Sequence, residues 1–442
     1  MTPVIKPRER SAILSSLRAG VVPRVGLQHL QVGRLDEVNA VLTDLDQIAQ
    51  GGAAVRFVVG RFGAGKSFFL NLCRMAALKK RFVVAQADLT LDRRLHGSGG
   101  QARGLYAELL QNLAILAKPE GGALSSIVER WISDLQHEVK SAGGTDADVT
   151  QTIHVRLKPL QDLVSGHDFA TVIGKYLEGF LTHNDAMTGA ALRWLRAEYG
   201  TKTEARQDLG VRAIIDDADI YDYLKLLAAF VRMAGYAGLL VCVDEMGVLS
   251  HRLSHPAARA ANFEAILRIV NDCLQGGAVG IGLFFAGINE FLEDQRRGLF
   301  SYDALRTRLE DKKLLQGAMK DFSGPVIRLA NLTPEELFVL LDKVVNVFAS
   351  GDSAKRPVPH EAIKAFMEHC SRGLGATYFQ TPRDVVRPFV SLLSILEQNP
   401  GTDWRTLLEK TQLDRSPDPD RDSSATDMSS QSAEEEIKTF RL

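Results

Sequence analysis

A glycine-rich octapeptide is the segment of this chain best suited to chemistry. Residues 60–67 match the pattern G-x-x-x-x-G-K-[ST] in full. Its glycines let the backbone wrap around an anion with N–H groups turned inward, and the helix that follows adds a positive dipole. Lys66 can reach the β- and γ-phosphates of a nucleotide, and the Ser67 hydroxyl can coordinate Mg²⁺. The segment therefore predicts a nucleotide site made of Gly60, Arg61, Phe62, Gly63, Ala64, Gly65, Lys66, Ser67 and Phe68.

Two adjacent acids supply a second chemical element. The apolar run 239–243, typical of a buried strand in a parallel sheet, ends at Asp244 and Glu245. Ligands of open α/β sheets bind at the carboxyl ends of the strands. We expect Asp244 to hold Mg²⁺, often through water, and Glu245 to orient and deprotonate the attacking water. The same two acids could simply mark a solvated strand end followed by a helix cap. The complete phosphate motif upstream favours the catalytic interpretation.

Two further features of the sequence indicate whether the nucleotide carries adenine or guanine. An aspartate followed directly by a glutamate at such a strand end is typical of P-loop ATPases with an in-line catalytic glutamate. The sequence shows no Asn/Thr-Lys-x-Asp segment of the kind that reads guanine. We therefore expect ATP and Mg²⁺ as cofactors, rather than GTP.

The elements around the motifs predict an α/β fold with a P-loop parallel sheet flanked by helices. Short apolar runs alternate with segments of helical periodicity, including a helix over 66–80 directly after the motif. The segment Thr333-Pro334-Glu335-Glu336 has the composition of a helix start. The expected strands are 55–59, 82–87, 239–243, 281–286 and 326–329.

The same pattern predicts the domain organisation. The first part reads as a basic, irregular lead-in, and the last part is rich in Ser, Asp and Pro, which is typical of disorder. We expect a lead-in at 1–29, an ATPase domain at 30–330 with a helical insertion at about 100–235, an all-helical lid at 331–413 and a disordered acidic tail at 414–442.

Bulk composition excludes few classes of protein. Residues 414–442 carry eight acidic and four basic side chains, a net charge of −4, which leaves +3 of the total of −1 for the rest. A mildly basic body permits DNA binding without demonstrating it. The four scattered cysteines, the N-terminus without a signal-peptide core and the lack of any eighteen-residue apolar run favour a cytoplasmic protein outside the membrane.

With these motifs in place, the chain resembles the AAA+ ATPases, especially their initiator-like branch. Val32-Gly33-Arg34-Leu35-Asp36-Glu37 looks like the family's entry segment, which implies that Gly33 and Arg34 border the adenine. The segment 284–289 looks like the sensor-1 strand, with Asn289 as the polar residue near the γ-phosphate. Gly287 stands at an equally plausible place in that segment.

The resemblance also extends to arginines. Arg306 and Arg308 sit where the family places an arginine finger that acts on the ATP of a neighbouring subunit, which implies a homo-oligomer. Arg383, in Thr381-Pro382-Arg383, resembles the sensor-2 arginine of the lid. Arginines on a polar helix face are also typical of surface ion pairs.

More narrowly, the chain resembles the BrxD-like ATP-binding proteins of bacterial BREX-type anti-phage systems. The segments 191–196, 235–240 and 296–305 carry this resemblance. It implies a defence role beside operon partners such as a helicase. The sequence Gly-Ile-Asn after Ala286 departs from the expected Gly-Thr-Pro.

Three functions are compatible with the sequence. The first is an oligomeric ATPase of a phage-defence complex, which couples ATP turnover to assembly or remodelling on DNA. The second is a slow nucleotide-dependent switch or loader for a helicase or another protein. The third is an initiator-like DNA-binding protein, which is weakened because residues 397–442 are short and acidic for a winged helix.

Overall fold

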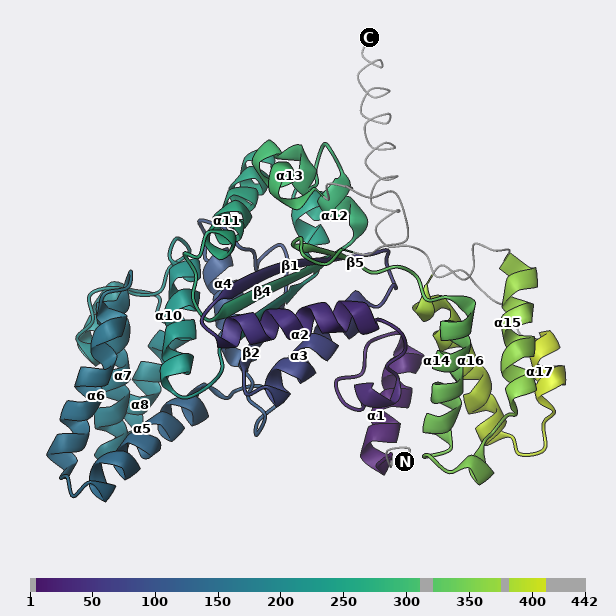
Figure 1. Cartoon of the computed structure of the whole chain (residues 1–442), viewed down its shortest axis with the longest axis horizontal. Helices are drawn as coiled ribbons and strands as arrows, with labels where there is room; N and C mark the ends of the chain where they lie inside the picture. The colour runs from purple at the N-terminus through teal and green to yellow at the C-terminus, as the bar shows by residue number, and fades with distance from the viewer. Residues whose placement is uncertain (1–4, 311–320, 375–380, 411–442) are drawn as a thin grey trace, which may run out of the picture. The chain divides into compact units, whose positions relative to one another are not determined.

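The computed structural model describes residues 5–310, 321–374 and 381–410 (Figure 1). The strands are β1 Ala53–Val59, β2 Val83–Asp88, β3 Leu239–Asp244, β4 Ile281–Gly287 and β5 Val326–Arg328. The helices up to β3 are α1 Pro7–Ala19, α2 Leu35–Ala49, α3 Lys66–Lys79, α4 Gln101–Gln111, α5 Leu124–Ser141, α6 Asp146–Gln161, α7 Gly166–Leu181, α8 Asp185–Leu195, α9 Lys202–Leu209 and α10 Ile220–Met233. Those after β3 are α11 Pro256–Leu274, α12 Asn289–Glu293, α13 Asp303–Leu309, α14 Pro334–Phe348, α15 His360–Leu374, α16 Pro382–Gln398 and α17 Trp404–Lys410.

The described strands form one parallel sheet in the order β2-β3-β4-β1-β5. Val84 pairs with Leu240 between β2 and β3, and Val241 pairs with Leu283 between β3 and β4. All residues of β1, β3 and β4 are buried, as expected for strands covered on both faces. The predicted α/β class and each of the five expected strands are confirmed, within one or two residues at the ends.

The chain divides into two compact units, of which the larger comprises residues 36–58 and 73–327. Its helices α4 to α10 all lie between β2 and β3 in the chain, which confirms the predicted helical insertion. Aromatic side chains from different helices join there: Trp131 meets Phe230 edge to face at 5.4 Å, and Trp194 meets Tyr223 at 5.7 Å. Such pairs add to the burial of apolar surface and fix how the helices pack.

A buried ion pair fastens α2 to the first strand in this unit. Arg56 donates to both carboxylate oxygens of Asp44 at 2.7 Å, and its Nη1 also donates to the carbonyl of Phe322 at 2.8 Å and to that of Gly324. A charge inside a buried strand is tolerated because a bidentate carboxylate and backbone acceptors replace its water. The strand that leads into the glycine-rich loop is therefore held in place at its middle.

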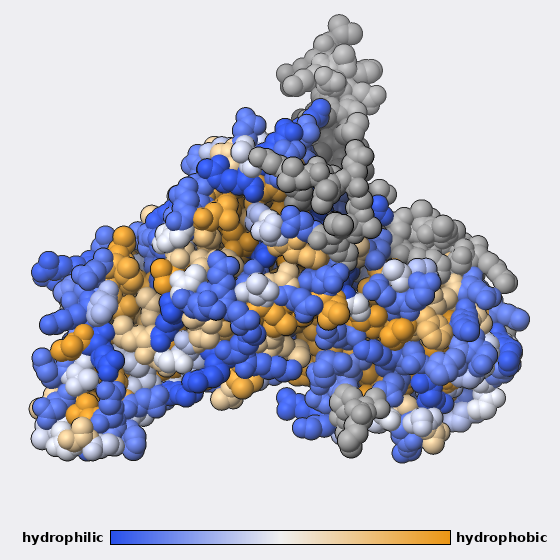
Figure 2. Space-filling model, in the orientation of Figure 1, coloured by the Kyte–Doolittle hydropathy of each residue, from blue (hydrophilic) through white to orange (hydrophobic). Residues whose placement is uncertain are grey.

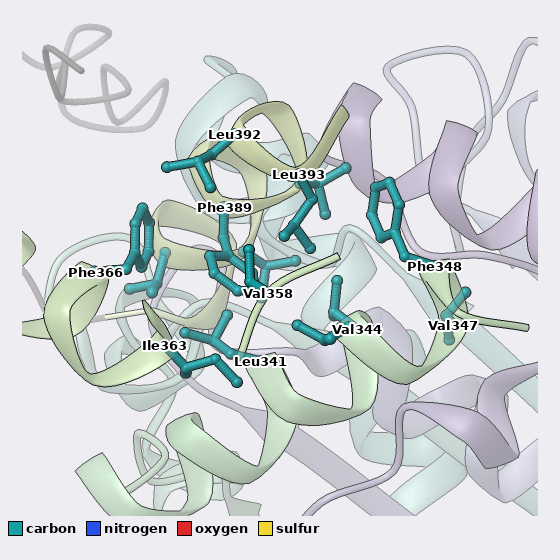
Figure 3. Packing of buried hydrophobic residues seen from close by; sticks show 14 of the residues in the cluster. Leu341, Val344, Val347, Phe348, Val358, Ile363, Phe366, Phe389, Leu392 and Leu393 are labelled. Atoms are coloured by element: carbon teal, nitrogen blue, oxygen red, sulfur yellow. The ribbon is translucent and has the colours of Figure 1, made fainter. Parts of the chain in front are cut away.

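The second unit comprises Met1–Leu35, Val59–Leu72 and Arg328–Leu442. Its core joins α14, α15 and α16 through residues such as Leu341, Phe366 and Phe389 (Figure 3). The predicted cap of α14 is confirmed, since the Thr333 hydroxyl accepts from Glu336 N–H and the Glu336 carboxylate accepts from Thr333 N–H. The described C-terminal part of the chain is therefore helical, as expected from the sequence.

The N-terminal segment differs from the expected irregular chain, because residues 7–19 form helix α1. Ile13 and Leu14 belong to the same hydrophobic core as α14 and α16. Arg10 donates to the Phe348 carbonyl at 3.0 Å and Arg18 to the Ser394 hydroxyl at 2.8 Å. The helix is thus an integral part of this unit.

Further expectations from the sequence concern which side chains are buried and which are exposed. The four cysteine side chains are buried, and burial raises the pKa of Cys242 to about 12, so this thiol stays protonated in the sheet. No helix among the described residues has the apolar length that a bilayer crossing requires. On the face shown in Figure 2, hydrophobic residues are interspersed with hydrophilic ones. The tail predicted at 414–442 lies outside the described residues.

Candidate active site

The glycine-rich loop connects β1 to α3 and has the backbone that anion binding requires. Gly63 and Gly65 have φ angles of +77° and +93°, in the left-handed region that favours glycine. The Lys66 ammonium donates to the carbonyls of Gly60 at 3.1 Å and Arg61 at 3.0 Å. Lysine thus closes the loop on itself, and Ser67 follows in the first turn of α3.

Three further residues of the predicted nucleotide site, Ala64, Phe68 and Phe62, have different surroundings. Ala64 is buried, and its N–H donates to the Arg61 carbonyl at 3.1 Å. Phe68 packs against the hydrophobic core of the second unit. Phe62 lies under the guanidinium of Arg383, whose Cζ is 4.9 Å from the ring centroid.

The entry segment contacts the loop directly. Arg34 donates from Nη2 to the Ala64 carbonyl at 3.3 Å and to the Ala330 carbonyl at 2.5 Å. Gly33 lies against the Glu336 side chain, at the start of α14. Arg34 and Gly33, the two residues expected near adenine, therefore contact the glycine-rich loop and the start of α14, respectively.

The two acids at the end of β3 have different environments. Asp244 is only 5 % exposed, and its Oδ1 accepts the N–H of Glu245 at 2.8 Å. Glu245 is exposed and has φ +59°, an uncommon conformation for a residue with a side chain. Backbone strain of this kind is often kept at functional sites. The buried acid suits a fixed metal ligand and the exposed one suits contact with water.

Sequence reasoning missed one acid at the same edge of the sheet. Asp88 ends β2 and pairs in register with Asp244 of β3. The Leu89 N–H donates to the Asp244 carbonyl at 3.0 Å, so the two strand ends are joined there. The signal was present in the sequence, because Asp88 follows a buried apolar strand as Asp244 does.

The sensor-1 segment runs beside the acid pair. Met246 N–H donates to the Ala286 carbonyl at 3.0 Å. Gly287 is packed so tightly that a Cβ there would lie 2.8 Å from the Phe291 ring and 3.2 Å from the Met246 side chain. Asn289 begins α12 and is partly exposed. Of the two positions weighed, Asn289 carries a polar side chain and Gly287 has no room for one.

The two candidate finger arginines share α13 and have different partners. Arg308 donates to the Asn271 side chain at 2.6 Å and to the Ala304 carbonyl at 2.7 Å. Arg306 is 44 % exposed and forms an ion pair with Glu310 at 3.4 Å. The structure therefore distinguishes Arg308, which is held by two hydrogen bonds, from the more exposed Arg306. The sequence did not distinguish them.

These residues fit ATP and Mg²⁺ by the chemistry of their groups. The left-handed glycines, the Lys66 ammonium and the start of α3 suit phosphate oxygens. Oxygen groups of the kind that Mg²⁺ takes as ligands are present in each unit, the Ser67 hydroxyl in one and the Asp244 carboxylate in the other. Bound Mg²⁺ would offset the charge that develops on the phosphates.

A comparison with known protein families supports ATP binding. The family model described as "BREX system ATP-binding protein BrxC/D" matches residues 5–412. A search of curated proteins finds no match to the chain. The matched range contains the glycine-rich loop, the acid pair and helices α14 to α17, and the family description names ATP as ligand. The chain therefore belongs to the BrxC/D family of BREX system ATP-binding proteins.

Proposed function

We propose that the protein is a Mg²⁺-dependent AAA+-like ATPase of a phage-defence complex. In this proposal the ATPase domain spans 30–330 and the lid 331–413, and the protein acts in the cytoplasm with other components of its system. ATP binding and hydrolysis drive assembly or remodelling on DNA. The observation that carries the proposal is a complete phosphate loop after β1 combined with Asp244 and Glu245 after β3 of the same parallel sheet.

The proposed division of labour follows from the environments of the side chains. The glycine-rich loop and Lys66 bind the phosphates, and Ser67 and Asp244 hold Mg²⁺. Glu245 takes the proton of the attacking water, for which its exposure to solvent is suitable. Arg383 and Asn289 contact the terminal phosphate, and Gly33 and Arg34 border the adenine.

Phosphate release by the purified full chain tests this function. We expect turnover with ATP and Mg²⁺, and loss of turnover with EDTA, because the terminal phosphate then lacks its metal. Duplex DNA should raise the rate if remodelling on DNA is the work performed. ATP binding without Mg²⁺-dependent phosphate release would contradict the ATPase, and a rate that DNA leaves unchanged would contradict the coupling to DNA.

We further propose that Arg306 is the arginine finger of a homo-oligomer. A surface ion pair at i,i+4 spacing contributes only about 0.3–0.5 kcal/mol. Arg306 can therefore leave Glu310 for the nucleotide of a neighbouring subunit at little cost. Arg308 is held by Asn271 and by its own helix.

Alanine variants of the two arginines should separate these roles. We expect Arg306→Ala to lower kcat about a thousandfold, the lower end of what a finger contributes, with unchanged ATP affinity and unchanged thermal stability. Arg308→Ala should instead lower the melting temperature, because it removes two hydrogen bonds of α13. Light scattering after size exclusion should show a multimer with ATP. Normal turnover by Arg306→Ala, or a monomer under all nucleotide conditions, would contradict the finger.

A further inference from the structure

We propose that Phe62 positions Arg383 for the terminal phosphate, a role that the phosphate-loop motif does not assign. The motif accepts any residue at this position. Here the position holds a ring with a cation above it. The proposal rests on the ATPase function proposed above and concerns how the site distinguishes ATP from ADP.

The first support is the stacking geometry. The Cζ atom of Arg383 is 4.9 Å from the centroid of the Phe62 ring, within the range of a cation–π interaction. Arg383 lies in the first turn of α16, and Phe62 lies in the loop. The ring therefore fixes where the guanidinium stands relative to the phosphate-binding backbone.

The second support is the space around the arginine. A Cβ at Gly63 would lie 2.6 Å from the Thr381 hydroxyl and 3.3 Å from Cβ of Arg383. A Cβ at Gly20, the left-handed residue that ends α1, would lie 3.1 Å from Arg383 Nε. The backbone of the loop and the end of α1 thus confine the arginine from two sides.

The third support is an unsatisfied donor. The Nε of Arg383 is buried and has no hydrogen-bond partner among the described residues. A buried donor of a charged group without an acceptor is costly. An acceptor that arrives with a ligand would therefore stabilise this guanidinium.

These observations combine into a mechanism for sensing the nucleotide. The ring holds the guanidinium ready, so less side-chain freedom is lost when a phosphate arrives. ATP brings one phosphate group more than ADP and therefore gains more from a charged donor held in place. Loss of the ring face should weaken ATP binding more than ADP binding.

Two conservative variants of the full chain test this. Phe62→Leu keeps an apolar side chain without a ring, and Phe62→Tyr keeps the ring as the control. By calorimetric titration we expect Phe62→Leu to weaken ATP binding about two- to fivefold, with ADP affinity changed far less. Phe62→Tyr should bind both nucleotides as the unmodified protein does.

A double-mutant cycle shows whether Phe62 acts through Arg383. In an Arg383→Ala background, Phe62→Leu should cause no further loss of ATP affinity, because the cation that it positions is gone. An equal loss in both backgrounds, or equal losses for ATP and ADP, would overturn the proposal. Failure of the unmodified protein to bind or hydrolyse ATP would contradict the proposed function instead.

Discussion

Lys66→Ala is expected to weaken ATP binding roughly a hundredfold, the upper range for loss of a hydrogen bond to a charged group, and to abolish turnover. The ammonium is the point charge that such loops present to the β- and γ-phosphates. In this structure it also bridges the carbonyls of Gly60 and Arg61, so the variant loses a brace of the loop as well as a charge. Calorimetric titration with ATP and a phosphate-release assay measure the two effects.

The same helix offers a matched control for this variant. Lys79 is exposed at the last position of α3, and Lys79→Ala removes the same charge far along the helix from the loop. We expect it to bind and hydrolyse ATP normally. An unchanged ATP affinity in Lys66→Ala would remove the basis for the nucleotide site at this loop.

Glu245→Gln is expected to keep ATP binding and to lose hydrolysis. A positioned general base contributes about 10²- to 10⁴-fold to a rate, and glutamine has the same size without a basic oxygen. Because Glu245 is exposed, the change should leave thermal stability intact. A single-turnover measurement with bound ATP separates the chemical step from binding.

A second acid serves as the control for this experiment. Glu264 is an exposed glutamate on α11, and Glu264→Gln makes the same chemical change on another element. Its turnover should equal that of the unmodified protein. Should Glu245→Gln hydrolyse ATP at the normal rate, the base must be sought elsewhere at the same sheet edge, with Asp88 the first candidate.

Local sequence patterns predicted the strands and most helices because the signal for each lies within a few residues. β1, β3 and β4 are continuously apolar and buried, so their interpretation did not depend on distant partners. Helix α6 lies in the insertion predicted to be helical, but no separate helix was predicted over its residues. Its buried residues, Val149, Ile153, Leu157 and Leu160, form one narrow stripe, and Pro159 lies inside the helix. A stripe this narrow gives a weak periodicity.

Helix α1 was missed for a different reason. Its signals were Pro7 at the first helical position and Gly20 after the last, a known asymmetry of helix ends. The basic composition of this segment led instead to the prediction of an irregular chain. The apolar residues that stabilise this helix are distant in the chain, so burial could not be inferred locally.

The site was predicted where a motif defines it, and less so where packing does. The glycine-rich loop and the acid pair are contiguous segments and were found as such. The contact of Phe62 with Arg383 joins positions far apart in sequence, and the left-handed backbone of Glu245 depends on the strand end around it. Neither property is encoded in a short pattern.

The shared core of α1 and the C-terminal helices has a consequence during protein synthesis. Ile13 and Leu14 leave the ribosome more than 320 residues before their partners in α14 and α16, such as Leu337 and Leu393. The chain of the larger unit ends at Ile327 and so precedes these partners completely. Until α14 and α16 have been synthesised, helix α1 therefore exposes an apolar face, which is a hazard of folds closed by late, distant contacts.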